Sequence, residues 1–131
     1  MSILSQDLLD SYGLELQVQI NSSGFGGIVF DYENALNFKF AGLLAGTNQV
    51  VIGHRTAAGW FFDKVVKQTV TKGVDYQLGV SVHDATVRVM FNGVTVASQT
   101  YQGFLNDGRV GLFTLKGASQ FDDVFMGATS R

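Results

Sequence analysis

The sequence predicts an all-β fold, a two-sheet antiparallel jelly-roll sandwich, in one domain spanning residues 1–131. Three observations predict it. Apolar and polar residues alternate with period two through most of the chain. Turn signals separate about ten short segments of this kind, as in sandwiches and jelly rolls. The length of 131 residues also matches a single hydrophobic core.

The predicted strands follow one another at short intervals. The first spans about 12–20, where apolar side chains from Tyr12 to Ile20 alternate with polar ones, a pattern typical of a half-buried strand. The others are predicted, in chain order, over 27–32, around Phe38 and Phe40, and over 50–55, 60–67, 76–83, 87–91, from Val94, 109–115 and 120–126. Residues 1–10 keep two interpretations, a short helix over 3–10 or an altered first strand.

The centre of the chain predicts a three-strand meander, because two turns agree on its register. A two-residue loop at Asp84-Ala85 sets Val80 opposite Val89. Asn92-Gly93 is a strong hairpin signal, since a type I′ turn needs positive φ at both positions, and it sets Val89 opposite Val96. A slip of one residue would turn the whole apolar face to water, so the register is well specified.

Composition and charge argue against several classes of protein. The net charge is −2 and the nine basic residues are scattered, so the basic stripe of a nucleic-acid-binding protein is missing. The apolar runs are too short for a membrane-spanning helix. The lack of cysteine excludes disulfides and zinc–thiolate sites. Residues 1–10 do not resemble a signal peptide, so we expect either a cytoplasmic protein or a module of a longer exported chain.

An ordered series of segments between residues 12 and 127 carries a family resemblance. The segments are Tyr12–Val18, Gly26–Tyr32, Asn37–Gly42, Val50–Gly53, Tyr76–Val82, Phe91–Val94, Gly108–Leu112 and Phe121–Val124. In this order they resemble the concanavalin A-like lectin/glucanase superfamily, in its laminin-G-like bacterial branch. The resemblance implies a jelly roll of two curved sheets. It also implies binding of glycans or protein partners, sometimes a structural calcium ion, and a place in large exported bacterial proteins and adhesins.

The catalytic pattern of the glycanases in this superfamily is missing from the chain. Those enzymes carry Glu-x-Asp-x-x-Glu on one strand, so that the carboxylates project into one cleft. Here Asp31 and Glu33 have a spacing of two without a third carboxylate, and Asp122 and Asp123 are neighbours. No Gly-x-Ser-x-Gly nucleophile turn occurs either. We therefore expect a protein that is not an enzyme.

Asp122 and Asp123 are the candidate calcium ligands, because calcium takes oxygen ligands and carboxylates at strand ends supply them. An alternative remains open. Asp123 shares a predicted strand face with Phe121 and Phe125, so it could be a buried carboxylate satisfied by backbone N–H groups. Asp31 and Glu33 are a further pair with the same two interpretations.

Two groups of residues are candidates for ligand binding. Trp60 could stack on a sugar ring with Arg55 across a short loop, although a core position is the alternative for so large an aromatic residue. The second group is a polar row on the central meander, which is either a binding surface or merely solvated; it comprises Gln77, Ser81, His83 and Arg88. His54 is expected at the edge of the core.

These observations predict a non-enzymatic recognition module that binds a glycan or a cell-surface protein and acts outside the cell or at its surface, with calcium as a candidate stabilising ion. The alternative is a structural or protein–protein interaction domain without a small ligand. It predicts self-association through an exposed sheet edge or apolar patch.

Overall fold

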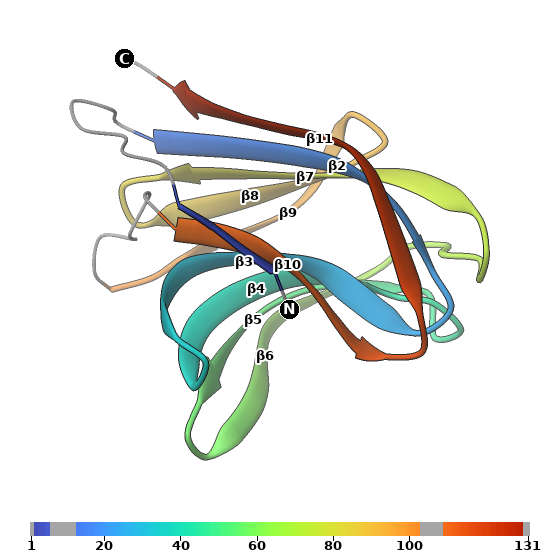
Figure 1. Ribbon diagram of the computed structural model, residues 1–131, viewed down its shortest axis with the longest axis horizontal. Coiled ribbons are helices and arrows are strands. Elements are labelled where there is room, and N and C mark those ends of the chain that lie inside the picture. The colour runs from blue at the N-terminus through green and yellow to red at the C-terminus, as the bar shows by residue number, and fades with distance from the viewer. Residues whose placement is uncertain (1, 6–12, 103–108, 130–131) are drawn as a thin grey trace.

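The computed structural model describes residues 2–5, 13–102 and 109–129, which form eleven strands in two antiparallel sheets (Figure 1). The strands are β1 (Ser2–Ser5), β2 (Gly13–Ser22), β3 (Phe25–Asn34), β4 (Asn37–Leu44), β5 (Gln49–Thr56), β6 (Gly59–Lys67), β7 (Asp75–His83), β8 (Thr86–Phe91), β9 (Val94–Thr100), β10 (Arg109–Lys116) and β11 (Ser119–Thr129). The predicted all-β sandwich is confirmed. No helix that could span a membrane occurs in the described segments.

The two sheets stack as layers. The six-stranded sheet has the order β1-β10-β3-β4-β5-β6, and the five-stranded sheet has the order β11-β2-β7-β8-β9 (Figure 1). Alternate side chains of both sheets meet between the layers and form the main core, as period-two alternation requires. Its fully buried members include Leu16, Val18, Ile20, Ile28, Phe30, Ile52, Leu78, Val80 and Val89. Leu16, Val18 and Ile20 of the predicted first strand thus belong to this core.

The predicted register of the central meander is confirmed between β7 and β8 and next to the Asn92-Gly93 turn, but not over the rest of the pairing between β8 and β9. Val80 pairs with Val89 across β7 and β8, as the Asp84-Ala85 loop predicts. Asn92 and Gly93 both have positive φ, as a type I′ turn requires. Val89, however, pairs with Ala97 and not with Val96, because a bulge between Val89 and Met90 shifts the register by one residue. A bulge depends on packing between strands, so the turn alone does not predict it.

The start of the chain is an edge strand. Ser2–Ser5 pair antiparallel with β10, with Ile3 opposite Gly111. The predicted helix over 3–10 is therefore wrong for residues 3–5, and the alternative of an altered first strand holds for them. Residues 6–12 lie outside the described residues. Sheet pairing with β10 outweighs the weak helical pattern, since a helix of two turns is unstable on its own.

A second, aromatic cluster covers the outer face of the six-stranded sheet, where "outer" means the face turned away from the other sheet. It is built from Phe25, Val29, Phe38, Phe40, Val51 and Phe113. Phe38 and Phe40, around which a strand was predicted, are buried on this outer face of β4. The opposite face, with Ala41 and Leu43, is buried in the main core. This strand is covered on both faces.

Two glycines make room for the rings of this aromatic cluster. A Cβ at Gly53 would lie 2.5 Å from Cζ of Phe40, and a Cβ at Gly42 would lie 2.6 Å from Cε1 of Phe25. The rings therefore rest on bare backbone, which is one reason why a glycine occurs inside a strand.

Candidate functional site

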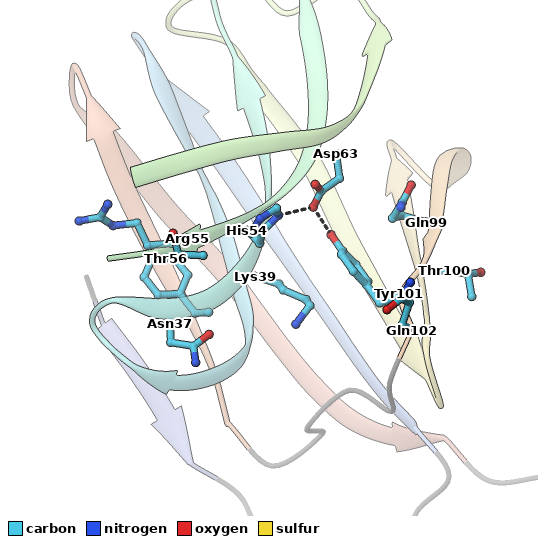
Figure 2. A pocket seen from close by; sticks show the side chains of 11 residues that line it. Asn37, Lys39, His54, Arg55, Thr56, Asp63, Gln99, Thr100, Tyr101 and Gln102 are labelled. Atoms are coloured by element: carbon cyan, nitrogen blue, oxygen red, sulfur yellow. Dashed lines mark hydrogen bonds and ion pairs between the residues drawn. The ribbon is translucent and has the colours of Figure 1, made fainter. Parts of the chain in front are cut away.

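A polar cavity lies at one end of the sandwich, where the six-stranded sheet and the end of β9 face each other (Figure 2). Its volume is about 660 Å³, within the usual range of about 300–1,000 Å³ for small-molecule sites. We call it the end cavity. It is lined by Asn37, Phe38, Lys39, His54, Arg55, Thr56, Asp63, Gln99, Thr100, Tyr101 and Gln102.

Three of these side chains form a hydrogen-bonded chain across the gap between the sheets. Asp63 Oδ2 accepts a hydrogen bond of 2.7 Å from the Tyr101 hydroxyl and lies 2.8 Å from His54 Nδ1. Figure 2 shows Asp63 between the two rings. The three residues come from β6, from β5 and from the segment after β9, so the contact ties the edge of one sheet to the other.

A β-bulge in β6 places Asp63 in this position. Gly53 pairs with Phe62 and Ile52 pairs with Lys64, so Asp63 is the extra residue between them. Bulges commonly re-aim a side chain. Beside the bulge, His54 pairs with Phe61 and their rings stack at 5.1 Å. The imidazole is therefore held on one side by a ring and on the other by a carboxylate.

Lys39 brings a positive charge into the cavity. It is the cross-strand neighbour of His54 and forms an ion pair with Asp31. Its ammonium group also lies 5.0 Å from the centre of the Tyr101 ring, a cation–π arrangement. The side chains of Lys39 and Asp31 are only 22% and 14% exposed, so water screens this pair less than a surface pair.

The hydroxyl of Tyr101 stays protonated. Burial raises the pKa of Tyr101 far above its ordinary value, and the hydrogen bond to Asp63 raises it further. The phenol is therefore a permanent donor to Asp63 at any physiological pH. The backbone of Tyr101 is also held in place, because its N–H donates to the Ala85 carbonyl at 2.8 Å.

The lining supplies the chemistry of hydrogen bonding to hydroxyl groups. Amides, hydroxyls, an ammonium group and an imidazole converge on one cavity beside the ring of Tyr101. The only carboxylate among the lining residues is Asp63. Among all described side chains, no group of three His, Asp or Glu residues could hold a metal ion.

Arg55 and Trp60, the first predicted pair, lie together on the outer face of the six-stranded sheet. They are cross-strand partners, and the guanidinium carbon lies 5.6 Å from the centre of the indole ring. Trp60 is partly buried and packs against Phe38 and Phe40 at 5.4 and 5.0 Å. It therefore belongs to the rim of the aromatic cluster and not to the main core. Arg55 also lines the end cavity, but its side chain points away from Asp63 in Figure 2.

The predicted polar row lies on the outer face of the five-stranded sheet. Ser81 pairs with exposed Arg88, and His83 pairs with Thr86 beside them. Gln77 donates to the side chain of Gln17 at 3.0 Å. Both layers of the sandwich therefore separate this row from Trp60, so the two predicted groups cannot form one site.

Asp122 and Asp123, the predicted calcium ligands, are both exposed at a bulge of β11. The alternative of a buried Asp123 is wrong, because the bulge breaks the alternation with Phe121 and gives Asp123 a positive φ of 51°. Asp123 instead lines a shallow depression together with Asp75. Asp31 and Glu33 hydrogen-bond to Lys39 and Asn37.

Sequence reasoning missed Lys39, Asp63 and Tyr101. One signal was available for Lys39: the apolar residues of 38–44 fall on both faces of a strand, which indicates a strand covered on both sides. No local signal marks Asp63, because a bulge re-aims it. Tyr101 contacts Asp63 across 38 positions of sequence.

Comparison with solved structures shows the same architecture in carbohydrate-binding proteins. The carbohydrate-binding module CBM66 from Bacillus subtilis superposes with a TM-score of 0.80 at 14% identity, covering 95% of this chain and 76% of that one. The galectin LEC-6 from Caenorhabditis elegans superposes with a TM-score of 0.73 at 11% identity, covering 95% of this chain and 89% of that one. Sheep galectin-11, in complex with glycerol, superposes with a TM-score of 0.70 at 10% identity, covering 95% of both chains.

At these identities the similarity establishes the fold, which is a concanavalin A-like jelly-roll sandwich, as the resemblance implied. Neither a family model nor a curated protein sequence matches the chain.

Proposed function

We propose that this protein is a non-enzymatic carbohydrate-recognition module that binds a glycan in the end cavity. The observation that carries the proposal is the lining of that cavity, in which amide, hydroxyl and ammonium groups surround the ring of Tyr101. Sugar hydroxyls need such donors and acceptors, because a hydroxyl that loses water without a new partner is costly. Structural neighbours that are a carbohydrate-binding module and galectins support it.

The tie between Asp63 and Tyr101 gives this site a fixed shape. Because it joins the edge of β6 to the segment after β9, a ligand would meet a cavity that is already formed. A preformed site loses less conformational entropy on binding than a mobile one. The proposed site therefore needs only modest contacts to reach useful affinity.

The cavity supports binding more than hydrolysis. Glycoside hydrolases generally use two carboxyl groups that flank the scissile bond. Among the residues that line the end cavity, Asp63 is the single carboxylate, and it already accepts a hydrogen bond from Tyr101. We therefore propose that a bound glycan is released intact, which a reducing-sugar assay after prolonged incubation would test.

A glycan array followed by isothermal titration calorimetry tests the proposal. We expect saturable binding that Gln99→Ala and Gln102→Ala each weaken about five- to tenfold, since each removes a hydrogen-bonding side chain worth about 1 kcal/mol. Both side chains end in the cavity, and Gln102 is exposed, so its variant should fold. No binding to any glycan, with the protein shown to be folded, would contradict the proposal.

The same titrations separate the end cavity from the predicted polar row. Arg88→Ala and Gln77→Ala change the outer face of the five-stranded sheet and leave the end cavity intact. Loss of affinity in these two variants and not in the glutamine variants of the cavity would place the glycan on the polar row instead.

Two finer parts of the proposal rest on the sequence. The first is a place in a longer exported protein or adhesin, where cell-surface fractionation with an antibody to this domain is the test. The second is calcium at Asp122 and Asp123, the pair of carboxylates that the sequence predicts as ligands. Because a ligand of the native state raises stability by mass action, a higher Tm in calcium than after chelation would support it.

A further inference from the structure

An apolar groove lies on the outer face of the six-stranded sheet. Its volume is about 410 Å³, and it is lined by Phe25, Leu44, Trp60, Phe61, Phe62 and Leu115. Phe62, at 47%, and Leu115, at 42%, are unusually exposed for their type. The ring of Phe61 stacks on His54 and therefore lies on the opposite face of β6. A contiguous exposed apolar surface of this kind marks an interaction site more often than chance.

The floor of the groove is rigid. Phe25 is 2% exposed and meets Phe62, Trp60 and Phe113 edge-to-face, with ring centres 5.8, 6.3 and 5.1 Å apart. Rings locked in this way cannot collapse to fill the groove, so it stays open for a ligand.

Positive charge flanks this groove. The Arg55 guanidinium lies over the ring of Trp60, and among the described residues it forms no ion pair with a carboxylate. Lys67 pairs with Gln49, which also pairs with Leu44, so register places exposed Lys67 on the same face. No Asp or Glu is found among the groove's lining residues.

We propose that this groove binds a small amphipathic carboxylate, a molecule with an apolar alkyl or aromatic body and one carboxyl group that pairs with Arg55. The apolar body fits a lining without polar side chains, where the hydroxyls of a sugar would lose water without replacement. The carboxylate fits the planar fork of Arg55, which offers two parallel hydrogen bonds. This groove lies on the outer face of the six-stranded sheet, and Arg55 at its edge also lines the end cavity, but the proposal does not depend on glycan binding.

The single tryptophan of the chain reports on this groove directly, since Trp60 lines it. We would titrate the protein with octanoate, 1-octanol and octylamine, which share one chain and differ in head group, and follow Trp60 fluorescence at low salt. We expect saturable binding with octanoate about three- to tenfold tighter than octanol, because a partly exposed ion pair contributes modestly. Octylamine should bind most weakly, and added salt should weaken octanoate alone.

Two variants test the assignment of the charge. Arg55→Gln should bring the affinity for octanoate down to that for octanol and leave the octanol affinity unchanged. Lys72→Gln removes one positive charge from an exposed position outside the groove and should preserve the preference for octanoate. Phe62→Ala, at a half-exposed position, should weaken the binding of all three compounds.

Three results would overturn the proposal. The first is the absence of saturable octanoate binding by the wild-type protein. The second is equal affinity for octanoate and octanol, which would leave Arg55 without a role. The third is concentration-dependent self-association that Phe62→Ala abolishes, since a second copy of the chain would then cover the groove.

Discussion

Replacement of Gly53 by alanine tests the close packing that underlies the aromatic cluster. The new Cβ would lie 2.1 Å from the backbone oxygen of Phe61 and 2.5 Å from Cζ of Phe40. Neither neighbour can move easily, because the oxygen belongs to β6 and the ring is fully buried. Overpacking of this kind costs about 1–3 kcal/mol, and the loss of glycine entropy in the unfolded chain offsets about 0.4–1 kcal/mol of it.

The measurement is urea unfolding followed by Trp60 fluorescence, with a thermal scan beside it. Because neither neighbour can move easily, we expect a cost in the upper part of that range, about 2–3 kcal/mol. After the offset, the free energy of unfolding of Gly53→Ala should fall by about 1–2.5 kcal/mol, which corresponds to a drop in Tm of roughly 4–9 °C for a domain of this size. The m-value should not change, since both states keep their compactness.

Gly79→Ala is the matched control, also inside a strand. Its Cβ would meet side-chain atoms only, 3.1 Å from Cε of Met90, the end of a flexible side chain, and at the ordinary contact distance of 3.5 Å from Cγ of Gln17 and Cβ of Met90. We expect its stability to stay within about 1 kcal/mol of the wild type. If Gly53→Ala were as stable as Gly79→Ala, the ring of Phe40 would not rest on bare backbone and the packing argument would be wrong.

Two further predictions concern Tyr101 and Asn48. The raised pKa of Tyr101 keeps its phenol protonated in the folded protein, while the same phenol ionises near the ordinary value of 10.0 in the unfolded chain. Above that pH the unfolded state therefore binds fewer protons than the folded state, so the free energy of unfolding falls as pH rises. One such group contributes at most about 1.4 kcal/mol per pH unit, and less here because Tyr101 is partly exposed. We would measure the unfolding of the wild type and of Tyr101→Phe between pH 8 and 11. The variant should be about 1 kcal/mol less stable than the wild type at pH 8, and this difference in free energy of unfolding should narrow above pH 10. A difference that stays constant with pH would contradict the raised pKa. Asn48 has a positive φ of 59° and its side-chain oxygen accepts from the backbone N–H of Val70 at 3.0 Å. The free energy of unfolding of Asn48→Ala should therefore fall by about 2–3 kcal/mol, and that of Asn48→Gly by about 1 kcal/mol less, because glycine tolerates the positive φ but cannot restore the hydrogen bond. Equal losses for the two variants in urea unfolding would mean that the backbone at this position is not strained.

Local pattern was enough to predict most strands and the pairing of β7 with β8 in the central meander, but not the bulge that shifts the pairing of β8 with β9. Alternation shows which residues share a face, and a two-residue turn such as Asn92-Gly93 aligns the strands on either side of it. Both signals are local, so they act before any distant contact forms. The pairing of Val80 with Val89 follows from them directly.

Alternation does not show whether a given face of a strand is turned toward the other sheet or away from it. Sequence reasoning therefore could not place the candidate groups relative to one another. Arg55 with Trp60 and the polar row around Arg88 were both candidates for ligand binding, yet the sandwich places them on opposite sides. Lys39, which alternates with two buried phenylalanines, points into the space between the sheets and not to solvent.

The sequence by itself determined the all-β class, the period of each strand and the local turns, because these depend on neighbours within a few residues. Only the tertiary structure decided the site. The end cavity depends on a bulge that re-aims Asp63 and on its hydrogen bond to Tyr101, 38 residues away in the chain. Contacts of this kind come from packing one sheet on another, which no local pattern encodes.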